Sequence, residues 1–534
     1  MIASYYSDII VTIILVLLLV MFSVPLIFFG WLYIRNRTQT QHSLLRGKYW
    51  FLGVLRYIIE KVGPEFRFYI TDADEGGRPI SRIKFVSIVK AAKYLKTLIS
   101  FGSKRDFAAP GFFIRNSLFP RLDGELEVDN SFLIQTRRYT ITDESLFFRS
   151  EKMEEVEVRP WFLTEANSLT VGPARERPWR LRGLIGQSGM SYGALGKSAI
   201  TALSKGISMA GGSWMNTGEG GLSEYHLSGG CDIIFQLGPG LFGARTPDGE
   251  LDWDKLKGIA RHQEIRAIEI KLGQGAKIRG GHVEGAKVTP EIAAIRGLTP
   301  WKSIDSPNRF SQFHDTPSLF DFIARVQQTT GLPVGIKVVI GGQESLDEVA
   351  AELRKRGTGP DFITVDGGEG GTGATFKEMA DSLGLPIYSA IVIANDSLRR
   401  HGVRDKVKLI ASGRLHLPDE QSVALALGAD LIAVARAFMI SVGCIMAEHC
   451  HSNQCPVGVA TTNPKSQRLL VVDEKKYRAL NYLITSRAGL FAIAAACGLT
   501  SPTQLTRDHV VFKDDRYRVV SGAQLFPNPE SGLL

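Results

Sequence analysis

The longest apolar run in the sequence lies near its start. Residues 9–34 carry no charge over 26 positions and include IIVTIILVLLLVMF. As a helix this run would be roughly 39 Å long, enough to cross a hydrocarbon core of about 30 Å. A cleaved signal peptide has a basic start and a shorter apolar core, whereas no Lys or Arg precedes this run. We therefore expect residues 1–35 to be an uncleaved transmembrane anchor.

From about residue 181, short apolar runs alternate with glycine-rich turns and amphipathic stretches. Seven of these runs have the length of buried strands, at 181–186, 233–237, 267–272, 334–340, 362–367, 407–412 and 431–436, and an eighth is expected near 208–216. Helical apolar spacing lies between them, at 200–210, 289–298, 317–330, 345–356 and 419–428. The pattern predicts an α/β fold, a (β/α)₈ TIM barrel over residues 181–470. A doubly wound open sheet is the alternative.

The segments around the predicted barrel are less regular. Residues 36–180 form a basic juxtamembrane region and a small N-terminal subdomain, with helical spacing at 86–98 and short strands at 132–142. Residues 471–534 are expected to form a C-terminal helical extension that packs against the barrel. Residues 36–180 contain no recognisable catalytic pattern.

The charge of the chain is concentrated beside the apolar run. Residues 35–107 contain 15 Lys or Arg and 6 Asp or Glu, so this segment accounts for the whole net charge of +9. Arg35, Arg37 and Arg46 lie at or just after the end of the anchor, so we expect a single-pass membrane protein with the bulk of the chain in the cytoplasm. The basic segment suits anionic membrane lipid better than nucleic acid, which we do not expect as a partner.

Three of the five cysteines are closely spaced. Cys444, Cys450 and Cys455 lie within twelve residues of one another, in GCIMAEHCHSNQCPVG, and this predicts a loop (444–456) that holds a metal centre. An iron–sulfur cluster is one interpretation. Zinc bound with His449 or His451 and three buried thiols without metal are the alternatives. Cys231 and Cys497 stand apart and are expected in the core.

Glycine clusters follow several of the predicted strands. The strand FITVD runs into DGGEGGTGA at 366–374, and Gly413–Arg414 and Arg436 follow the last two strands. Loops after the last barrel strands commonly bind phosphate, so the pattern indicates a phosphate-bearing cofactor. Lys337 lies within the apolar strand VGIKVVI, where it is either a cation beside a flavin or part of a structural ion pair.

Residues 268–296 combine glycines with basic side chains. Lys271, Lys277, Arg279 and Arg296 lie in this stretch. Such a composition is suited to holding a dicarboxylate, and a solvated surface is the alternative.

The motifs together resemble the FMN and iron–sulfur domain of glutamate synthase. GMSYGALGKSA (189–199), NTGEGG (216–221), QGAK (274–277), DGGEGGTGA (366–374) and the three-cysteine run match in order, and the resemblance covers about 186–466. It implies a flavoprotein oxidoreductase with FMN and a 3Fe-4S cluster. It also implies that hydride passes to 2-iminoglutarate, formed from 2-oxoglutarate and ammonia, to give L-glutamate.

The resemblance also implies roles for individual residues. Cys444, Cys450 and Cys455 would hold the cluster. Lys277 and Arg296 would bind the 2-oxoglutarate carboxylates, with His282 where the family has a substrate-contacting glutamine. Glu219 would lie near the path of ammonia, and we count Glu219, Lys277, Arg296 and Lys337 as catalytic candidates. The residues expected around FMN are Met190, Ser191, Lys337, Gly370, Gly371, Thr372, Gly373, Gly413, Arg414 and Arg436.

The sequence departs from the family in ways that affect substrate and partners. GAKIRGGH (275–282) lacks the family's proline, and Gly368 and Glu369 replace a histidine and an aspartate. We find no glutaminase nucleophile and no second dinucleotide-binding GxGxxG, so nitrogen is expected from ammonia or another amine. Electrons are expected from a partner protein, such as a ferredoxin or a reductase subunit. The alternatives are action on a different 2-oxo acid or amine, as in N-methylglutamate synthesis, and a non-catalytic electron-transfer module.

Overall fold

A computed structural model describes residues 2–39, 43–46, 50–275, 277 and 281–529. The chain divides into two compact units, Met1–Gly77 and Arg78–Leu534, and each is described by itself. The first unit begins with α1 (Ile2–Thr38) and continues through α2 (Ser43–Arg46), α3 (Trp50–Phe66) and the π-helical turn η1 (Arg67–Thr71).

Helix α1 contains the apolar run, and its side chains from Ile9 onward are almost all exposed. By length and composition it could cross a membrane, and an N-terminal signal sequence would meet the same criteria. Helix α16 (Val472–Ala496) also meets them, but two thirds of its apolar window is buried, as in the core helix of a soluble domain. The predicted apolar helix at the start of the chain is therefore confirmed.

The second unit contains eight parallel strands in the sequential order of a barrel. They are β8 (Ile185–Gln187), β9 (Trp214–Asn216), β10 (Asp232–Leu237), β11 (Ile265–Lys271), β14 (Val334–Val338), β15 (Phe362–Asp366), β16 (Lys408–Ser412) and β17 (Leu431–Val434). Each strand pairs with its neighbour and β17 pairs with β8. The predicted (β/α)₈ barrel is confirmed, including the eighth strand, β9.

Strands β8 and β9 complete the ring by close packing. A Cβ on Gly186 would lie 2.1 Å from the Trp214 ring, so only glycine allows this approach. The backbone N–H of Met190 donates to the Asn216 carbonyl at 3.2 Å just beyond the strands. The barrel is thus nearly closed, and every strand delivers its carboxyl end to the same rim.

A buried acid links strands inside the barrel. Glu269 on β11 accepts hydrogen bonds from Asn216 Nδ2 at 2.8 Å, Gln236 Nε2 at 2.5 Å and Thr364 Oγ1 at 2.5 Å. These partners come from β9, β10 and β15. Because a buried carboxylate must be satisfied, this network fixes the strands beneath the rim.

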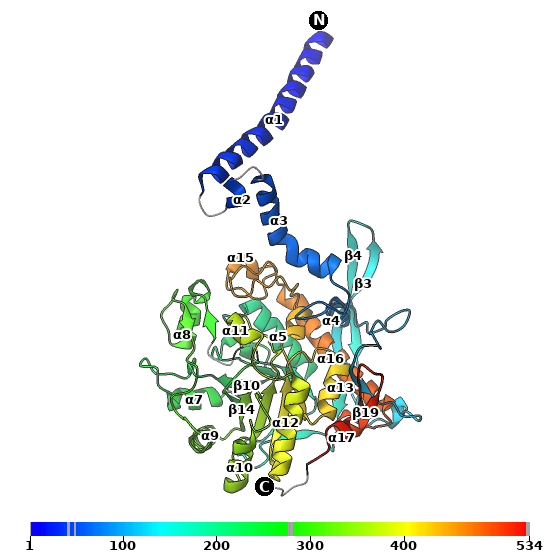
Figure 1. Ribbon diagram of the computed structural model, residues 1–534, viewed down its shortest axis with the longest axis vertical. Coiled ribbons are helices and arrows are strands. Elements are labelled where there is room, and N and C mark those ends of the chain that lie inside the picture. Colours follow the sequence, from blue (N-terminus) through cyan, green and yellow to red (C-terminus); the bar gives the residue numbers. More distant parts are fainter. Residues whose placement is uncertain (1, 40–42, 47–49, 276, 278–280, 530–534) are drawn as a thin grey trace. The chain divides into compact units, whose positions relative to one another are not determined.

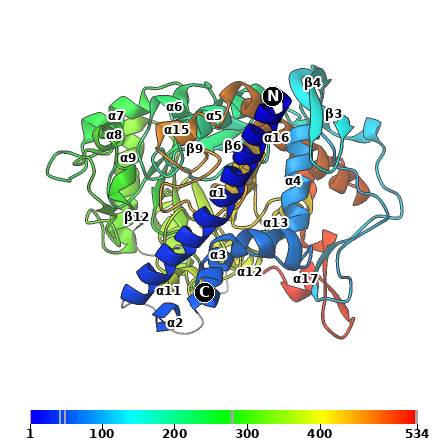
Figure 2. The same cartoon turned by 90° about the horizontal axis from the view of Figure 1, so that it is seen from above.

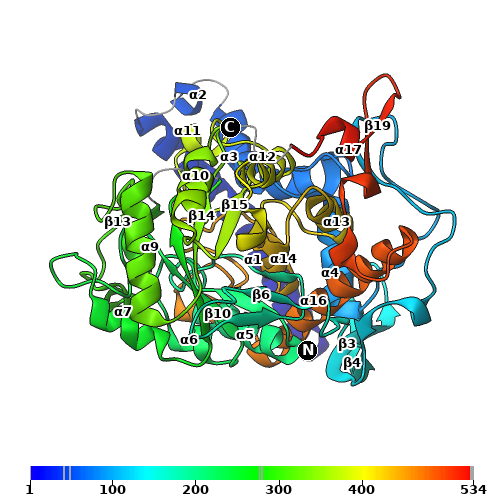
Figure 3. The same cartoon turned by 90° about the horizontal axis from the view of Figure 1, so that it is seen from below.

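Helices surround the barrel on its outer face. They include α5 (Lys197–Ala210), α7 (Trp253–Ala260), α8 (Pro290–Arg296), α9 (Thr316–Thr330), α10 (Asp347–Arg356), α12 (Ile387–Arg400) and α13 (Pro418–Ala426). Figure 3 shows α9, α10 and α12 outside β14 and β15, and Figure 2 shows α5, α6 (Glu224–Leu227) and α7 following one another around the rim. The predicted helices at 200–210, 289–298, 317–330, 345–356 and 419–428 all form.

The remaining elements cover one side of the barrel. Helix α4 (Arg82–Tyr94) ends four residues earlier than the predicted helix at 86–98, because Leu95 adopts a left-handed conformation with φ 53°. The predicted strands at 132–142 form one long strand, β3 (Ile134–Glu144), which pairs in a hairpin with β4 (Arg149–Val158), a strand that the sequence pattern did not predict. Helix α16 provides the expected C-terminal helix. Beyond it, β18 (Val510–Lys513) and β19 (Val519–Ser521) pair with β1 (Gly111–Ile114), which the sequence pattern did not predict.

Candidate functional site

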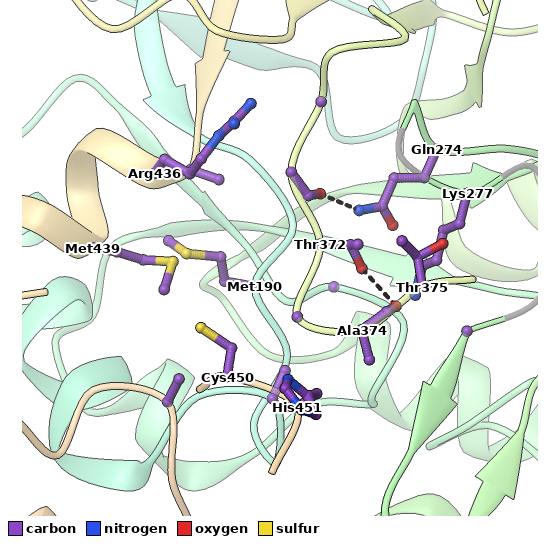
Figure 4. A pocket seen from close by; sticks show the side chains of 18 of the residues that line it. Met190, Gln274, Lys277, Thr372, Ala374, Thr375, Arg436, Met439, Cys450 and His451 are labelled. Atoms are coloured by element: carbon purple, nitrogen blue, oxygen red, sulfur yellow. Dashed lines mark hydrogen bonds between the residues drawn. The ribbon is translucent and has the colours of Figure 1, made fainter. Parts of the chain in front are cut away.

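A cavity of about 880 Å³ lies at the carboxyl ends of the barrel strands. Its volume is in the range of cofactor and substrate sites. Figure 4 shows Met190 and Arg436 on one side of the cavity, with Gln274 and Lys277 opposite and Cys450 and His451 below. A second, smaller cavity of about 40 Å³ lies deeper, beside Lys337, Gly413 and Arg414.

One end of the large cavity holds a cluster of buried cations around Glu219. Lys271 Nζ lies 2.9 Å from Glu219 Oε1, and Lys277 Nζ lies 3.4 Å from the same oxygen. Lys271 is the last residue of β11, whereas Glu219 follows β9 and is 15% exposed. Arg296, at the end of α8, is 2% exposed and donates from Nη2 to the Tyr192 carbonyl at 3.0 Å.

The cluster carries more positive than negative charge. Burial alone would raise the pKa of Glu219, but the charges of Lys271 and Lys277 outweigh it and lower this pKa to about 2. Burial lowers the pKa of Lys271 to about 8, although Glu219 opposes this shift. Burial likewise lowers the pKa of Arg296 to about 10, and its Nε has no hydrogen-bond partner in the described part of the chain. Three cations around one carboxylate make this end a site for an anion.

The other end of the cavity is formed by the glycine loop after β15. A Cβ on Gly371 would lie 3.1 Å from Arg436 Nε, and Gly370 is crowded by Gly367 and Asp366, so larger side chains would close the space. Arg436 Nη2 donates to the Glu369 carbonyl at 2.6 Å. The loop is held from across the cavity by Gln274, whose Nε2 donates to the Gly371 carbonyl at 2.6 Å, as Figure 4 shows.

Arg414 and Arg436 bring two guanidinium groups to this loop. The charges of Asp366, Glu369 and Glu420 act on Arg436. Within the described residues, Arg414 Nε has no hydrogen-bond partner. Burial and the nearby charge of Arg414 together lower the pKa of Arg436 to about 10. Two adjacent cations at a glycine-lined barrel rim fit the phosphate of a nucleotide cofactor.

Lys337 is buried between the two cavities. Its Nζ lies 3.5 Å from Asp366 Oδ2, and both side chains are at least 94% buried. The same Asp366 oxygen accepts a hydrogen bond from the Gly275 backbone N–H at 2.8 Å. The ion pair that was one of the two interpretations of Lys337 is therefore present, and the lysine also lines the smaller cavity.

The cysteine loop closes the third side of the cavity. Cys444, Cys450 and Cys455 all line it, together with His449 and His451. Burial raises the pKa of Cys444 to about 12, and burial also raises that of Cys450. Among the described residues, no three His, Cys, Asp or Glu side chains converge as a metal-binding group. The donor set still suits a cluster, because three thiols face one cavity from a single loop.

The loop has an unusual backbone. Met446, Glu448 and Asn453 adopt positive φ values of 58°, 55° and 65°. Such conformations are costly for residues other than glycine and concentrate at functional sites. A loop that curves tightly to direct several thiols inward accounts for them.

Lys287 joins the cysteine loop to the rest of the site, and the sequence motifs did not reveal it. Its Nζ donates to the carbonyls of Ala194 at 2.8 Å and Cys450 at 3.0 Å, with Ala460 at 3.4 Å. Lys287 is 4% exposed, and burial lowers its pKa to about 8. It lies nine residues before Arg296, so one short segment contacts both the cysteine loop and the cation cluster.

His282 lies at the cavity wall between two acids. Its Nδ1 is 2.9 Å from Asp305 Oδ1, and its Nε2 is 3.4 Å from Glu284 Oε1. The hydrogen bond with Asp305 raises the pKa of His282. The residue expected at the substrate position is thus held by a short antiparallel pairing of β12 (His282–Val283) with β13 (Ile304–Asp305).

The structure brings most of the predicted site residues to one place. The large cavity is lined by the three cysteines, by Glu219, Lys277, Arg296 and His282, and by Met190, Ser191, Gly370, Gly371, Thr372 and Gly373. The smaller cavity is lined by Lys337 and Gly413. Both cavities are lined by Arg414 and Arg436. Arg279 lies outside the described residues. Cys231 and Cys497 are buried in the core, as expected. Lys271, Gln274 and Lys287 have contacts that no local pattern revealed.

Comparison with known proteins shows the family to which the chain belongs. The model of the conserved region in glutamate synthase matches residues 125–500. The glutamate synthase large subunit-like protein YerD of Bacillus subtilis is 49% identical over 500 residues, which cover 93% of this chain and 95% of that protein. An archaeal glutamate synthase [NADPH] of Methanocaldococcus jannaschii is 31% identical over 313 residues, which cover 58% of each chain.

A solved structure of mandelate oxidase aligns over 88% of this chain and 98% of that chain with 13% identity and a TM-score of 0.40. At that identity and score, the family assignment depends on the family model and the sequence relatives. The family model covers more than two thirds of the chain, and YerD matches it almost end to end. This chain belongs to the glutamate synthase family of oxidoreductases.

Proposed function

We propose that this protein catalyses the FMN-dependent reductive amination of 2-oxoglutarate to L-glutamate, with ammonia or an amine supplied from outside. The observation that carries the proposal is the excess of buried positive charge at both ends of one cavity. Lys271, Lys277 and Arg296 surround Glu219 at one end. Arg414 and Arg436 lie beside the glycine loop at the other. These ends suit a dicarboxylate and a cofactor phosphate, respectively.

The residues that would hold FMN are those of the glycine loop and its neighbours. Arg414 and Arg436 would bind the phosphate, and Met190 and Gly371 would flank the ring. When bound, FMN supplies the hydride that reduces the carbon–nitrogen double bond of the imino acid. Lys337, fixed by Asp366 at 3.5 Å, would place a positive charge near the ring and favour its anionic reduced form.

The cation cluster would position the oxo acid. Lys277 and Arg296 bind its two carboxylates, and their burial strengthens these contacts by excluding water. Once Lys277 turns to the substrate, Glu219 loses one of the charges that hold its pKa at about 2. The pKa of Glu219 then rises, so its carboxylate can take the proton that ammonium releases as nitrogen adds to the substrate.

The cysteine loop would hold a 3Fe-4S cluster through Cys444, Cys450 and Cys455. The three thiols line the cavity that also holds the glycine loop, and Lys287 fixes the Cys450 backbone carbonyl. A cluster in this place would pass electrons between a partner protein and the flavin. The electron donor in this proposal is a separate protein, such as a ferredoxin or a reductase subunit.

We also propose that α1 is a single-pass membrane anchor that leaves the second unit in the cytoplasm. Arg35 and Arg37 lie in the last turn of the helix. Their guanidinium groups lie 5.2 Å and 5.3 Å from the ring centres of Trp31 and Tyr33. Aromatic and basic residues at one end of an apolar helix are typical of the cytoplasmic membrane interface.

The catalytic proposal is tested with the full chain in detergent under anaerobic conditions. We expect bound flavin and about three irons per chain, as a 3Fe-4S cluster requires. After reduction, 2-oxoglutarate with ammonium should reoxidise the flavin and yield glutamate. Bound flavin that stays reduced with every oxo acid and amine, yet reoxidises rapidly with an electron-transfer protein, would replace this proposal with the electron-transfer module.

A second candidate acts on a different 2-oxo acid or amine, as in N-methylglutamate synthesis. The observation that favours it is His282, which presents an imidazole held by Asp305 and Glu284 at the cavity wall. A comparison of oxo acids with ammonium and with methylamine distinguishes the two. If 2-oxoglutarate with ammonium is the fastest pair, the first candidate stands; if another pair is faster, the second does.

A further inference from the structure

The hairpin of β3 and β4 presents three apolar side chains at its tip. Leu146 is 89% exposed, Phe147 is 93% exposed and Phe148 is 56% exposed. The turn between the strands is ordered, because the Ser145 backbone N–H donates to the Phe148 carbonyl at 2.8 Å. Figure 1 shows the hairpin projecting from the body of the second unit. We call Leu146, Phe147 and Phe148 the hairpin tip.

The hairpin is a fixed part of the second unit. At its base, Asn481 of α16 accepts from Thr136 Oγ1 at 2.7 Å and donates to the Arg137 carbonyl at 2.9 Å. Further along, Tyr139 OH donates to Glu474 Oε2 at 2.9 Å. Three hydrogen bonds to one helix hold the apolar residues in a defined direction, toward and beyond the N-terminal end of α16.

Several charged residues near the tip are paired with one another. Arg149 Nε donates to Glu144 Oε1 at 2.9 Å across the hairpin. At the end of α4, Lys93 Nζ donates to Glu151 Oε1 at 2.6 Å, and Tyr94 OH donates to the same oxygen at 2.5 Å. Figure 2 shows α4 beside the hairpin. The tip can therefore leave water without separating these charges from their partners.

We propose that the hairpin tip inserts into the interface of a lipid bilayer and forms a second membrane contact of this protein. The inference rests on the proposed anchor, because α1 would keep the second unit near the bilayer at a high effective concentration. Phe and Leu side chains partition into the headgroup and acyl boundary without spanning the membrane. Three adjacent apolar residues on a rigid hairpin would otherwise stay in water at a free-energy cost.

The chain provides a matched control in the same unit. Leu118 and Phe119 are 89% and 85% exposed, as much as the tip. They lie at the opposite end of α16, where the Arg121 backbone N–H donates to the Ala495 carbonyl at 2.9 Å and Arg121 Nε to the Gly498 carbonyl at 3.0 Å. A 25-residue helix is about 37 Å long, so an orientation in which the tip points into the bilayer along α16 leaves Leu118 and Phe119 far from that interface.

The test uses the full chain in nanodiscs of phosphatidylcholine that carries a photoactivatable diazirine on its acyl chain. After irradiation and trypsin digestion, we expect lipid adducts on peptide 1–35 and on peptide 139–149, and none on peptide 116–121. Replacing the tip with serine (Leu146→Ser, Phe147→Ser and Phe148→Ser together) should remove the adduct on 139–149. Leu118→Ser with Phe119→Ser should leave it unchanged.

The outcomes separate this inference from the anchor. Adducts on 1–35 without adducts on 139–149 would overturn the inference and leave the anchor standing. Absence of adducts on both peptides would overturn both. Equal labelling of 139–149 and 116–121 would also overturn it. Thermal unfolding of both serine variants checks that they remain folded, which the exposure of the replaced side chains leads us to expect.

Discussion

At the mouth of the barrel, Lys271, Lys277 and Arg296 are at most 9% exposed, whereas in α1 apolar residues such as Leu17 and Leu26 are 62% and 73% exposed. These two regions depart from the usual distribution of charged and apolar residues in opposite directions. Each departure costs free energy unless a specific environment offsets it. In our proposals, an anionic ligand offsets the cost of the buried charges, and lipid offsets the cost of the exposed apolar surface. The two regions for which we propose functions are therefore those whose side chains are unfavourably solvated.

The largest effect we expect comes from deleting residues 2–38. Each Leu, Ile, Phe or Val at the centre of a membrane helix contributes about 0.3–0.6 kcal/mol to insertion, so many of them together dominate localisation. The full chain should stay in the membrane fraction after carbonate extraction, and the deletion variant should move to the soluble fraction. Leu17→Ile serves as a control that keeps the apolar character. Cleavage of the full chain to a shortened, released product would instead identify a signal sequence.

The second effect concerns the partner of the buried lysines. Glu219→Ala leaves Lys271 and Lys277 without a counter-charge, which should reduce the free energy of unfolding by about 3–5 kcal/mol. Urea denaturation measures this loss, and Glu219→Gln should lose less because the amide can still accept hydrogen bonds. Because the folded-state pKa of Glu219 is lowered to about 2, its stabilisation is present near neutral pH and disappears as pH falls below the ordinary carboxyl range. Unchanged denaturation of the alanine variant would show that the lysines find other partners.

The third effect concerns the opposite end of the cavity. Arg436→Met removes one of two guanidinium groups at the glycine loop and should weaken FMN binding about 10- to 100-fold, which corresponds to about 1.4–2.8 kcal/mol for a charge-assisted contact. Flavin fluorescence titration of the flavin-depleted protein gives the dissociation constant. Arg400→Met, which removes an ion pair with Asp347 on the outer helices, should bind FMN normally. Equal affinity in both variants would exclude Arg436 from the phosphate site.

The smallest effect is a pH dependence at the cation cluster. Since the pKa of Lys271 is lowered to about 8, its charge is lost as pH rises through that value, well before an exposed lysine would titrate. The KM for the oxo acid should therefore rise above pH 8, by several-fold within one pH unit, with less change in kcat. Lys271→Arg keeps its charge and should move this rise to higher pH. An identical profile for the two proteins would assign the dependence to another group.

The features that depend on local sequence pattern could be predicted from the sequence alone. Seven of the eight strands were predicted from apolar runs, because a strand buried on both faces consists mostly of apolar residues. The glycines after the strand at 366–374 and the spacing of Cys444, Cys450 and Cys455 were enough to indicate a cofactor site, since these residue types have few other reasons to cluster. The end of α4 was misjudged because the left-handed Leu95 carries no sequence signal for a helix terminus.

Long-range contacts were decided only by the tertiary structure. Glu219 and Lys271 are 52 residues apart, and they meet because β9, β10 and β11 end at the same rim. In the sequence, Lys287 cannot be distinguished from a surface lysine. In the structure, its ammonium group donates hydrogen bonds to the carbonyls of Ala194, Cys450 and Ala460. The exposure of the hairpin tip likewise depends on how the rest of the unit packs around it and cannot be predicted from Leu146–Phe148 themselves. Local pattern determines which residues form strands and turns, whereas barrel closure determines which charges share a low-dielectric space and so which of them can act together.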